Sequence, residues 1–393
     1  MSQPVRYAAA ADHLFDGTAL HDDCAVLIDG GEIAQLVGRD DIPRGIPVHD
    51  LPTGAWLAPG FIDVQVNGGG DVLFNDEPTP AGIAAIAAAH RRFGTTSLLP
   101  TLISDTLEKM RAARDAVSEA MRSNPSVLGI HFEGPFLSAD RPGVHDPRML
   151  RWPEPHDLAW LTGSPDGVVV VTLAPEVVPA GFIAALTQAG VKVSLGHSMA
   201  SYVETRAALA EGLTGFTHLF NAMRPLASRE PGPIAAALES ENCWFSMIVD
   251  GVHVDPAMLR LALRGRARPM LVTDAMPPVG GARHSFMLGG RTITLGPNGC
   301  TRDDGTLAGT ALDMATAVRN AVKLLQMPLT DALRAAGAEP ARFLGLAHRL
   351  GHLAPGSRAD MVALDAQDIV VLETWVAGHA SGEKPFRACM TRR

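Results

Sequence analysis

The chain has 393 residues, of which 47% are hydrophobic, so it can bury a large core and is too long for one small domain. Its formal net charge is −9 and it has no long basic run, which argues against nucleic acid or an anionic membrane as a partner and favours a small substrate. The four cysteines form no C-x-x-C pair, and the N-terminus has no apolar stretch of signal-peptide length, so we expect a cytoplasmic protein.

The two ends of the chain share one pattern of short β-like pieces. Residues 1–55 contain "CAVLIDGGEIAQLV", with turn-forming Asp-Gly-Gly in the middle, and residues 351–393 contain short alternating strands separated by Gly and Pro. We infer that these two segments pair into one small β-sandwich-like domain. Residues 56–350 then form a second, larger domain.

In the larger domain, apolar β-rich runs alternate with alanine-rich stretches that favour helices, several of which close at glycine. Strands that alternate with helices pair in parallel, and eight of them close a (β/α)8 TIM-type barrel of the α/β class. An open doubly wound sheet has the same alternation and is the alternative. The predicted strands cover residues 60 to 67, 95 to 101, 127 to 133, 168 to 173, 191 to 197, 214 to 219, 243 to 249 and 269 to 274.

The placement of polar residues favours the barrel. Barrel enzymes build their active sites at the C-terminal ends of the strands. One polar residue at a strand end could be structural, but six on different strands are hard to explain as solvated loops. These six residues are Asn67, Thr101, Glu133, His197, His218 and Asp274.

The first predicted strand, "GFIDVQVNGG", projects Asp63, Gln65 and Asn67 from one face, because side chains alternate along a strand. In a metal-dependent hydrolase this face often carries two histidines two residues apart. Neutral amides are poor ligands for a transition metal beside imidazole and carboxylate. We therefore expect any second metal position here to be weak or vacant, with Gln65 and Asn67 ordering the water around a single ion.

Three residues could hold that ion. Glu133 in "LGIHFEGPFLS" lies on an apolar strand, where a carboxylate is costly to bury unless it is paired or coordinated. His197 in "VSLGHSMA" and His218 in "GFTHLFNAM" end later strands. A lone buried Glu is usually salt-bridged and a lone buried His is usually only hydrogen-bonded. Together, one carboxylate and two imidazoles make a known catalytic zinc set with one open position for water.

Four further residues could take part in chemistry. Asp274 in "LVTDAM" is either a helix N-cap or a general base for water, and His145 in "RPGVHDP" could polarise a carbonyl or lie on the surface. Arg229 and His253 lie near the expected mouth, where they would suit a phosphate or a carboxylate or remain solvated. No Walker-type glycine loop accompanies them, which argues against a nucleotide triphosphate.

The motifs "PGFIDVQVNGGG", "HFEGPFLS", "RPGVHDP", "THLFNAM", "REPG", "DGVH" and "LVTDAM" together resemble the N-acetylglucosamine-6-phosphate deacetylase family of the amidohydrolase superfamily. The resemblance runs from about residue 55 to the tail. It implies metal-dependent hydrolysis of the N-acetyl group of N-acetyl-D-glucosamine 6-phosphate in amino-sugar catabolism. The products would be D-glucosamine 6-phosphate and acetate, with metal-bound water as nucleophile and Asp274 as general base and then acid.

The resemblance also implies roles for individual residues. Glu133, His197 and His218 would hold one divalent ion per subunit, with zinc as the first choice and iron, cobalt or manganese as alternatives. His145 would help to polarise the amide carbonyl. In this family the arginine of "REPG" reaches the neighbouring active site, which implies a homodimer. The implied substrate contacts are Val144, Asn221, Ala222, Arg229, His253, Leu307, Ala308 and Gly309.

Three alternatives remain open at this point. The first is another amidohydrolase, a cyclic amidase or a nucleobase deaminase, although such enzymes usually keep both first-strand histidines and have no need of Arg229. The second is an N-acetylgalactosamine-6-phosphate deacetylase. The third is a non-catalytic barrel that has lost its metal, against which the presence of Glu133, His197, His218 and Asp274 argues.

Overall fold

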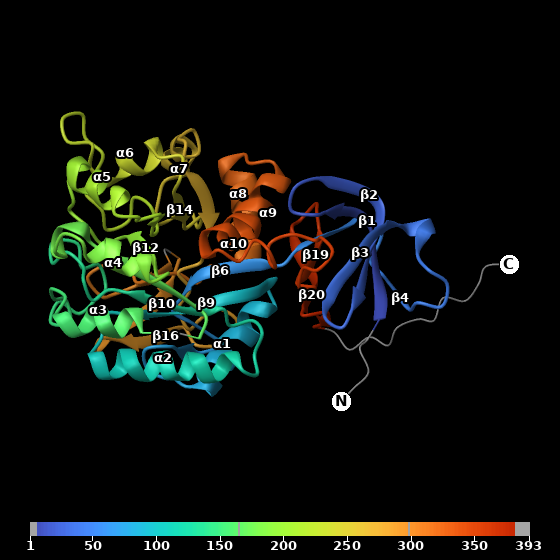
Figure 1. The fold of residues 1–393 in the computed structure, drawn as a ribbon, viewed down its shortest axis with the longest axis horizontal. Helices are drawn as coiled ribbons and strands as arrows, with labels where there is room; N and C mark the ends of the chain where they lie inside the picture. The colour runs from blue at the N-terminus through green and yellow to red at the C-terminus, as the bar shows by residue number, and fades with distance from the viewer. Residues whose placement is uncertain (1–5, 164–165, 298, 382–393) are drawn as a thin grey trace.

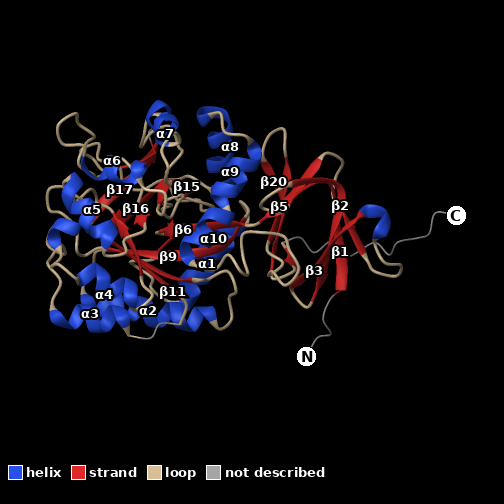
Figure 2. Cartoon of the chain, turned by 45° about the horizontal axis from the view of Figure 1, so that its top comes forward, coloured by secondary structure: helices blue, strands red, loops and turns tan. Residues whose placement is uncertain are grey.

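Two bodies make up the computed structural model, which describes residues 6–163, 166–297 and 299–381. A barrel of strands wrapped by helices lies beside a smaller domain built almost only of strands (Figures 1 and 2). Helices α8 (Met314–Leu325), α9 (Leu329–Ala336) and α10 (Ala338–Leu344) lie on the side of the barrel that faces the smaller domain (Figure 1). Within the described residues, no helix has both the length and the apolar character needed to cross a membrane.

Eight parallel strands form the barrel, each beside the next one along the chain. The residues that follow the last strand bring the two edges of this sheet together, because Val66 forms a parallel bridge with Ala275 and the Asp274 N–H donates to the Gln65 carbonyl at 3.0 Å. The predicted (β/α)8 barrel is therefore confirmed. The strands are β6 (Phe61–Val66), β9 (Thr95–Ile103), β10 (Gly129–Glu133), β11 (Val168–Leu173), β12 (Lys192–Leu195), β13 (Gly215–Phe216), β14 (Trp244–Met247) and β15 (Arg268–Leu271).

Each of the eight predicted strands overlaps one of these strands, but two end three residues earlier than predicted. β13 ends at Phe216 instead of residue 219, and His218 after it has a φ of 35°. β15 ends at Leu271 instead of residue 274, and Asp274 has a φ of 51°. A positive φ is incompatible with extended backbone. The extended backbone of both strands thus ends before the candidate site residues His218 and Asp274.

Helices cover the barrel, and several begin at side-chain caps. The Thr79 side chain accepts from the N–H of Gly82, and Ser201 and Glu204 form a capping box. The helices are α1 (Pro80–Arg91), α2 (Leu107–Met121), α3 (Pro155–Thr162), α4 (Phe182–Gln188), α5 (Tyr202–Ala210), α6 (Gly232–Glu239), α7 (Pro256–Ala262), α8 (Met314–Leu325), α9 (Leu329–Ala336) and α10 (Ala338–Leu344), with 3-10 turns η1 (Arg39–Asp41) and η2 (Pro175–Val177).

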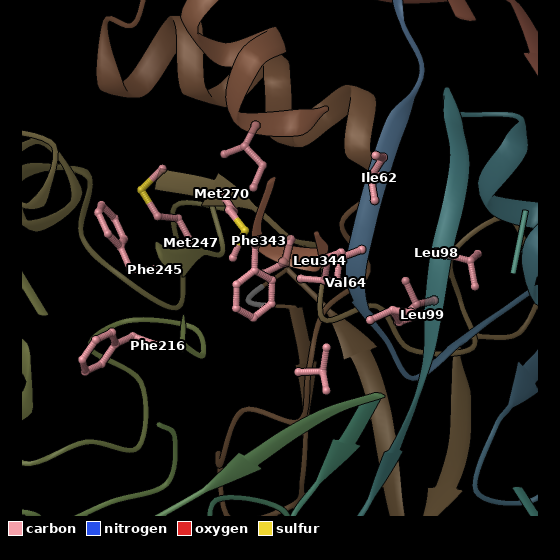
Figure 3. Close-up of a cluster of buried hydrophobic side chains, with 14 of the residues drawn as sticks. Ile62, Val64, Leu98, Leu99, Phe216, Phe245, Met247, Met270, Phe343 and Leu344 are labelled. Carbon is pink, nitrogen blue, oxygen red and sulfur yellow. The ribbon is translucent and has the colours of Figure 1, made fainter. Parts of the chain in front are cut away.

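The apolar face of β6 packs under the last helices. Ile62 and Val64 are buried, and Figure 3 shows Val64 in one cluster with Phe343 and Leu344 of α10. Burying a side chain of this size contributes about 1.5–3 kcal/mol. Because neighbouring side chains on a strand point to opposite faces, this packing leaves the side chain of Gln65 on the face that is directed into the barrel.

As the sequence predicts, both ends of the chain together form the smaller, sheet-rich domain, and its strands lie in one sheet. β5 pairs antiparallel with β19, so segments some 300 residues apart lie side by side. The strand order is β21-β20-β19-β5-β1-β2-β3, with β4 beside β1. The boundaries drawn at residues 55 and 350 stay a prediction. The strands are β1 (Arg6–Phe15), β2 (Leu20–Asp29), β3 (Glu32–Gly38), β4 (Val48–Asp50), β5 (Ala55–Pro59), β19 (Met361–Asp365), β20 (Val370–Val376) and β21 (His379–Ala380).

Two small sheets were not expected from the sequence. One is the antiparallel set β16 (Ser285–Leu288), β17 (Arg291–Gly296) and β18 (Gly299–Thr301), and the other is the pair β7 (Gly68–Gly69) and β8 (Val72–Leu73). A bridge between Thr301 and Leu307 joins β18 to the segment that follows it. This added sheet therefore brings Leu307 and Gly309 to the mouth of the barrel.

Candidate active site

A cavity of about 340 Å³ opens at the C-terminal ends of the barrel strands. Side chains from five different strand ends line it: Asn67 follows β6, Glu133 ends β10, His197 follows β12, His218 follows β13 and Asp274 follows β15. The fold thus brings together residues that are up to 207 positions apart in the chain. This is the face on which barrel enzymes place their active sites.

Glu133, His197 and His218 converge on one point inside the cavity. The Oε1 atom of Glu133 lies 3.1 Å from Nε2 of His197 and 3.0 Å from Nε2 of His218, and the two Nε2 atoms are 3.2 Å apart. All three side chains are buried. Ligand atoms about 2.0–2.1 Å from a tetrahedral ion lie roughly 3.3 Å from one another. The three atoms therefore have the chemistry and the spacing of a site for a divalent metal ion.

The partner of the second ring nitrogen prepares His197 for metal binding. Nδ1 of His197 lies 2.8 Å from the carbonyl oxygen of Arg141, which can only accept. Nδ1 must therefore carry the proton, and in the neutral ring this leaves the lone pair on Nε2, the nitrogen that faces Glu133. For His218, Nδ1 is buried without a hydrogen-bond partner in the described part of the chain.

The charges in this cluster compensate one another. Burial opposes ionisation of Glu133, yet its close contacts with the rings of His197 and His218 hold the pKa of that carboxyl well below its usual range. Burial also lowers the pKa of His218, but the contact with Glu133 outweighs burial and the net shift is upward. A buried carboxylate that attracts positive charge so strongly is suited to a bound cation.

Backbone strain accompanies these side chains. His197, His218 and Asp274 have φ values of 48°, 35° and 51°, in the left-handed region that residues other than glycine rarely adopt. Such conformations cost on the order of 1–3 kcal/mol each and concentrate at functional sites. Local hydrogen bonds hold them in place: the His218 N–H donates to Oγ of Ser246 at 2.7 Å, and the Thr310 N–H donates to the Asp274 carbonyl at 2.9 Å.

The two amides of the first strand bind Asp274. Nδ2 of Asn67 donates to Oδ1 of Asp274 at 2.6 Å, and Nε2 of Gln65 donates to the same oxygen at 3.2 Å. With two donors on Oδ1, the other oxygen is left for proton transfer. Burial, and then the charge of Glu133, raise the pKa of Asp274 to about 6. The sequence suggested that these amides order water, and the structure adds a direct contact with the carboxylate.

His145 lies beside the cluster of Glu133, His197 and His218. Its Nε2 is 4.0 Å from Oε1 of Glu133, and its ring meets that of His197 edge-on at 4.6 Å between centroids. Burial, and then the neighbouring His197, lower the pKa of His145 to about 3, so the ring is neutral at pH 7. Nδ1 faces Ser104, whose hydroxyl oxygen is 2.8 Å away.

Most of the substrate contacts implied by the sequence line this cavity, but two do not. Ala308 is fully buried, and Arg229 is exposed on the loop before α6; neither is among the described residues that line the cavity. His253 lies at the wall, where Asp250 holds its Nδ1 at 2.6 Å. The implied contacts that do line the cavity are Val144, Asn221, Ala222, His253, Leu307 and Gly309.

Sequence reasoning missed several residues of the site. Some have no chemical signal of their own because they contribute only apolar surface or backbone. Ser104 was also missed. It directly follows the strand that contains Thr101 and ends at Ile103, and this position at a strand end could have identified it. The missed residues that line the cavity are Ile103, Gly143, Ile248, Met276, Gly305 and Thr306.

A parallel barrel with a buried carboxylate and two histidines at its C-terminal face is the architecture of a metal-dependent hydrolase, and the comparison with known families agrees. Residues 56–381 match the amidohydrolase family model, and the chain belongs to that family. A divalent metal is implied by this membership together with the buried Glu133, His197 and His218.

Within the family, the relatives of this chain are amino-sugar-phosphate deacetylases. It is 42% identical to an N-acetylgalactosamine-6-phosphate deacetylase of Shewanella sp. (strain ANA-3), over 91% of this chain and 92% of the relative. It is 34% identical to an N-acetylglucosamine-6-phosphate deacetylase of Haemophilus influenzae, over 91% and 94%. The crystal structure of N-acetylglucosamine-6-phosphate deacetylase from Pasteurella multocida superposes with a TM-score of 0.93 at 34% identity, covering 96% of this chain and all of that one.

Proposed function

We propose that the protein hydrolyses the N-acetyl group of N-acetyl-D-glucosamine 6-phosphate, releasing D-glucosamine 6-phosphate and acetate. The observation that carries the proposal is the convergence of Glu133, His197 and His218 within hydrogen-bond distance of one another, in a cavity that Asp274 also lines. The chain is also related to a deacetylase over 91% of its length. Because such a substrate is phosphorylated and therefore charged, it does not cross membranes freely, which fits a cytoplasmic enzyme.

Glu133, His197 and His218 would hold the metal. A divalent cation bound there would supply Lewis acidity towards the attacking water and the amide carbonyl. We propose zinc, since a carboxylate with two neutral imidazoles is a common catalytic zinc set. Only one ion is proposed, because Gln65 and Asn67 present amide nitrogens to Asp274 where two imidazoles would be needed for a second.

Asp274 would move the proton. An amide has a poor leaving group, so its hydrolysis needs a base for the water and an acid for the departing amine. The free oxygen of Asp274 takes a proton from the water and then delivers it to the sugar nitrogen. A carboxylate whose burial raises the pKa to about 6 can do both near neutral pH. His145, neutral and beside the cluster, would donate a hydrogen bond from Nε2 to the carbonyl oxygen and stabilise the charge that develops there.

The phosphate would be held at the cavity wall formed by Asn221, Ala222 and His253. Arg229 lies outside the cavity of its own chain and is exposed, on a loop that also exposes Leu226. We propose a homodimer in which Arg229 of each subunit reaches the phosphate in the neighbouring site. An arginine guanidinium suits a phosphate because it can form two parallel hydrogen bonds with it.

A second substrate is supported by one observation. The Shewanella relative, at 42% identity, is named for N-acetylgalactosamine 6-phosphate. The two sugars are epimers that differ at one hydroxyl, so the same reaction centre would serve either. The galactosamine epimer is therefore the second candidate.

The test is a steady-state assay of acetate and amine release from both 6-phosphates, with metal content measured on the same sample. The proposal expects the N-acetylglucosamine compound to be the better substrate and about one transition metal ion per chain. Faster hydrolysis of a dihydropyrimidine or deamination of adenine would refute it. Protein that binds no transition metal in metal-supplemented medium would refute it too, and a preference for the galactosamine epimer would move the assignment to the second candidate.

A further inference from the structure

His145 and His197 differ in the backbone group that meets Nδ1 of the ring: the Ser104 N–H for His145 and the Arg141 carbonyl for His197. Nδ1 of His145 is contacted twice by Ser104: the backbone N–H donates to it at 3.3 Å, and the hydroxyl oxygen is 2.8 Å away. The inner nitrogen, Nε2, is directed towards Glu133. All of these groups are buried.

The backbone N–H of Ser104 decides which nitrogen of His145 carries the proton. An N–H group can only donate, so the Nδ1 atom it meets must offer a lone pair, and the proton of the neutral ring must be on Nε2. In the opposite arrangement Nδ1 would donate to the Ser104 hydroxyl, and the buried Ser104 N–H would lose its acceptor. An unsatisfied buried donor is strongly disfavoured, so the first arrangement prevails.

The environment of His197 gives the opposite result. There a carbonyl oxygen, that of Arg141, faces Nδ1 at 2.8 Å and draws the proton to that side. The backbone group at Nδ1 therefore places the proton on different nitrogens in the two neighbouring rings, His197 and His145. His197 presents a lone pair, as a metal ligand must, and His145 presents an N–H, as a donor to a carbonyl must.

Ser104 is itself held rigidly. The side chain of Asn75 binds both backbone groups of Ile103, the residue before Ser104. Its Oδ1 accepts from the Ile103 N–H at 3.1 Å, and its Nδ2 donates to the Ile103 carbonyl at 3.2 Å. Nδ2 also contacts the carboxylate of Asp105 at 3.1 Å. The two residues that flank Ser104 are therefore anchored, and its N–H keeps a fixed direction towards His145.

We propose that Ser104 is a positioning residue that fixes neutral His145 with its proton on Nε2, aimed at the substrate carbonyl. The inference rests on the proposed function, since it assumes a carbonyl substrate. The position of the proton on the His145 ring, in contrast, can be measured whether or not the protein has this activity. Ser104 touches no side chain of Glu133, His197 or His218; apart from a 3.4 Å contact of its hydroxyl with the Glu133 carbonyl oxygen, it meets the site at His145.

Two measurements on the metal-loaded enzyme test the proposal. In protein with ¹⁵N-labelled histidine, the His145 resonances are identified by their loss in a His145→Asn variant. We expect Nδ1 to resonate as an unprotonated nitrogen and Nε2 as a protonated one. In kinetics, Ser104→Ala removes the hydroxyl and loosens the ring, so kcat should fall about five- to tenfold, the effect of one hydrogen bond, with KM within about twofold. Ser104→Thr, which keeps a hydroxyl, should restore kcat to within about twofold.

Ser126→Ala is the matched control, because Ser126 is as buried as Ser104 but lies before β10, away from the cavity. A merely structural role for Ser104 would lower the melting temperature in both serine variants and leave kcat unchanged in both, which would overturn the proposal. A protonated Nδ1 in the wild-type spectrum would overturn it as well. If the wild-type protein failed to deacetylate either sugar, the proposed function would fall, while the spectrum would still decide the position of the proton.

Discussion

Asn67 offers a sharp test of how the amides after the first barrel strand act on Asp274, the proposed acid/base carboxylate. Its Nδ2 donates to Oδ1 of Asp274 at 2.6 Å inside the protein. A hydrogen bond to a charged group contributes about 1.5–3 kcal/mol. Because this donor stabilises the ionised form of Asp274, the Asn67→Ala substitution should raise the pKa of that carboxyl. At about 1.36 kcal/mol per pKa unit, the lower end of the range corresponds to roughly one unit.

The assay is the pH profile of kcat/KM. If Asp274 acts as the base, the acidic limb of the profile should move to higher pH by about one unit in Asn67→Ala. Gln65→Ala should move the limb less, because its contact with Asp274 is longer, 3.2 Å. Asn124→Ala is the control: this amide binds the N–H of Ser126, at the other end of the barrel, and its loss should leave the limb in place. An unmoved limb in Asn67→Ala would refute the reasoning.

Three further predictions follow from the same structure. Asp274→Asn should keep its metal but lose about 10²–10⁴-fold in kcat, as the loss of a general acid/base does; substantial remaining turnover would remove Asp274 from this role. Arg229→Ala should raise KM for the 6-phosphate but not for the unphosphorylated sugar, and the exposed Arg264→Ala should raise neither; an equal effect on both sugars would exclude a phosphate contact. Asp63 is fully buried, and burial raises its pKa to about 7, above the unfolded value of about 3.9. The stability that this raised pKa contributes is fully present below about pH 4 and is lost as the pH rises through about 7. The melting temperature should therefore fall less between pH 5 and pH 8 in Asp63→Asn than in wild type. An identical fall by calorimetry would contradict this.

The barrel was predictable because its signal is long-range and repeated. Eight apolar runs separated by helix-favouring stretches have few other solutions, and strand ends in a parallel sheet meet on one face. That rule alone places Glu133, His197 and His218 together. The small sheet β16 to β18 was missed because it lies outside this repeat, in short strands of mixed polarity.

The contacts that tune the site were beyond sequence reasoning. Asn67 reaches an aspartate 207 residues away, and Ser104 meets a histidine 41 residues away. The carbonyl of Arg141 and the N–H of Ser104 are backbone groups, and every residue has both except proline, which lacks the N–H, so no side-chain motif marks them. The left-handed φ of His197 depends on tertiary contacts rather than on its own propensity.

The pairing of β5 with β19 has a consequence for how the protein is made. On the ribosome, β5 emerges early, but the strand that covers its edge is about 300 residues further along. At a synthesis rate of about 5–20 residues per second, that edge waits roughly 15–60 s for its neighbour. During this interval the nascent N-terminal sheet presents unpaired backbone groups to any other strand nearby. Completion of the smaller domain is therefore one of the last events of biosynthesis, and chains released before β19 is made are the ones most exposed to aggregation.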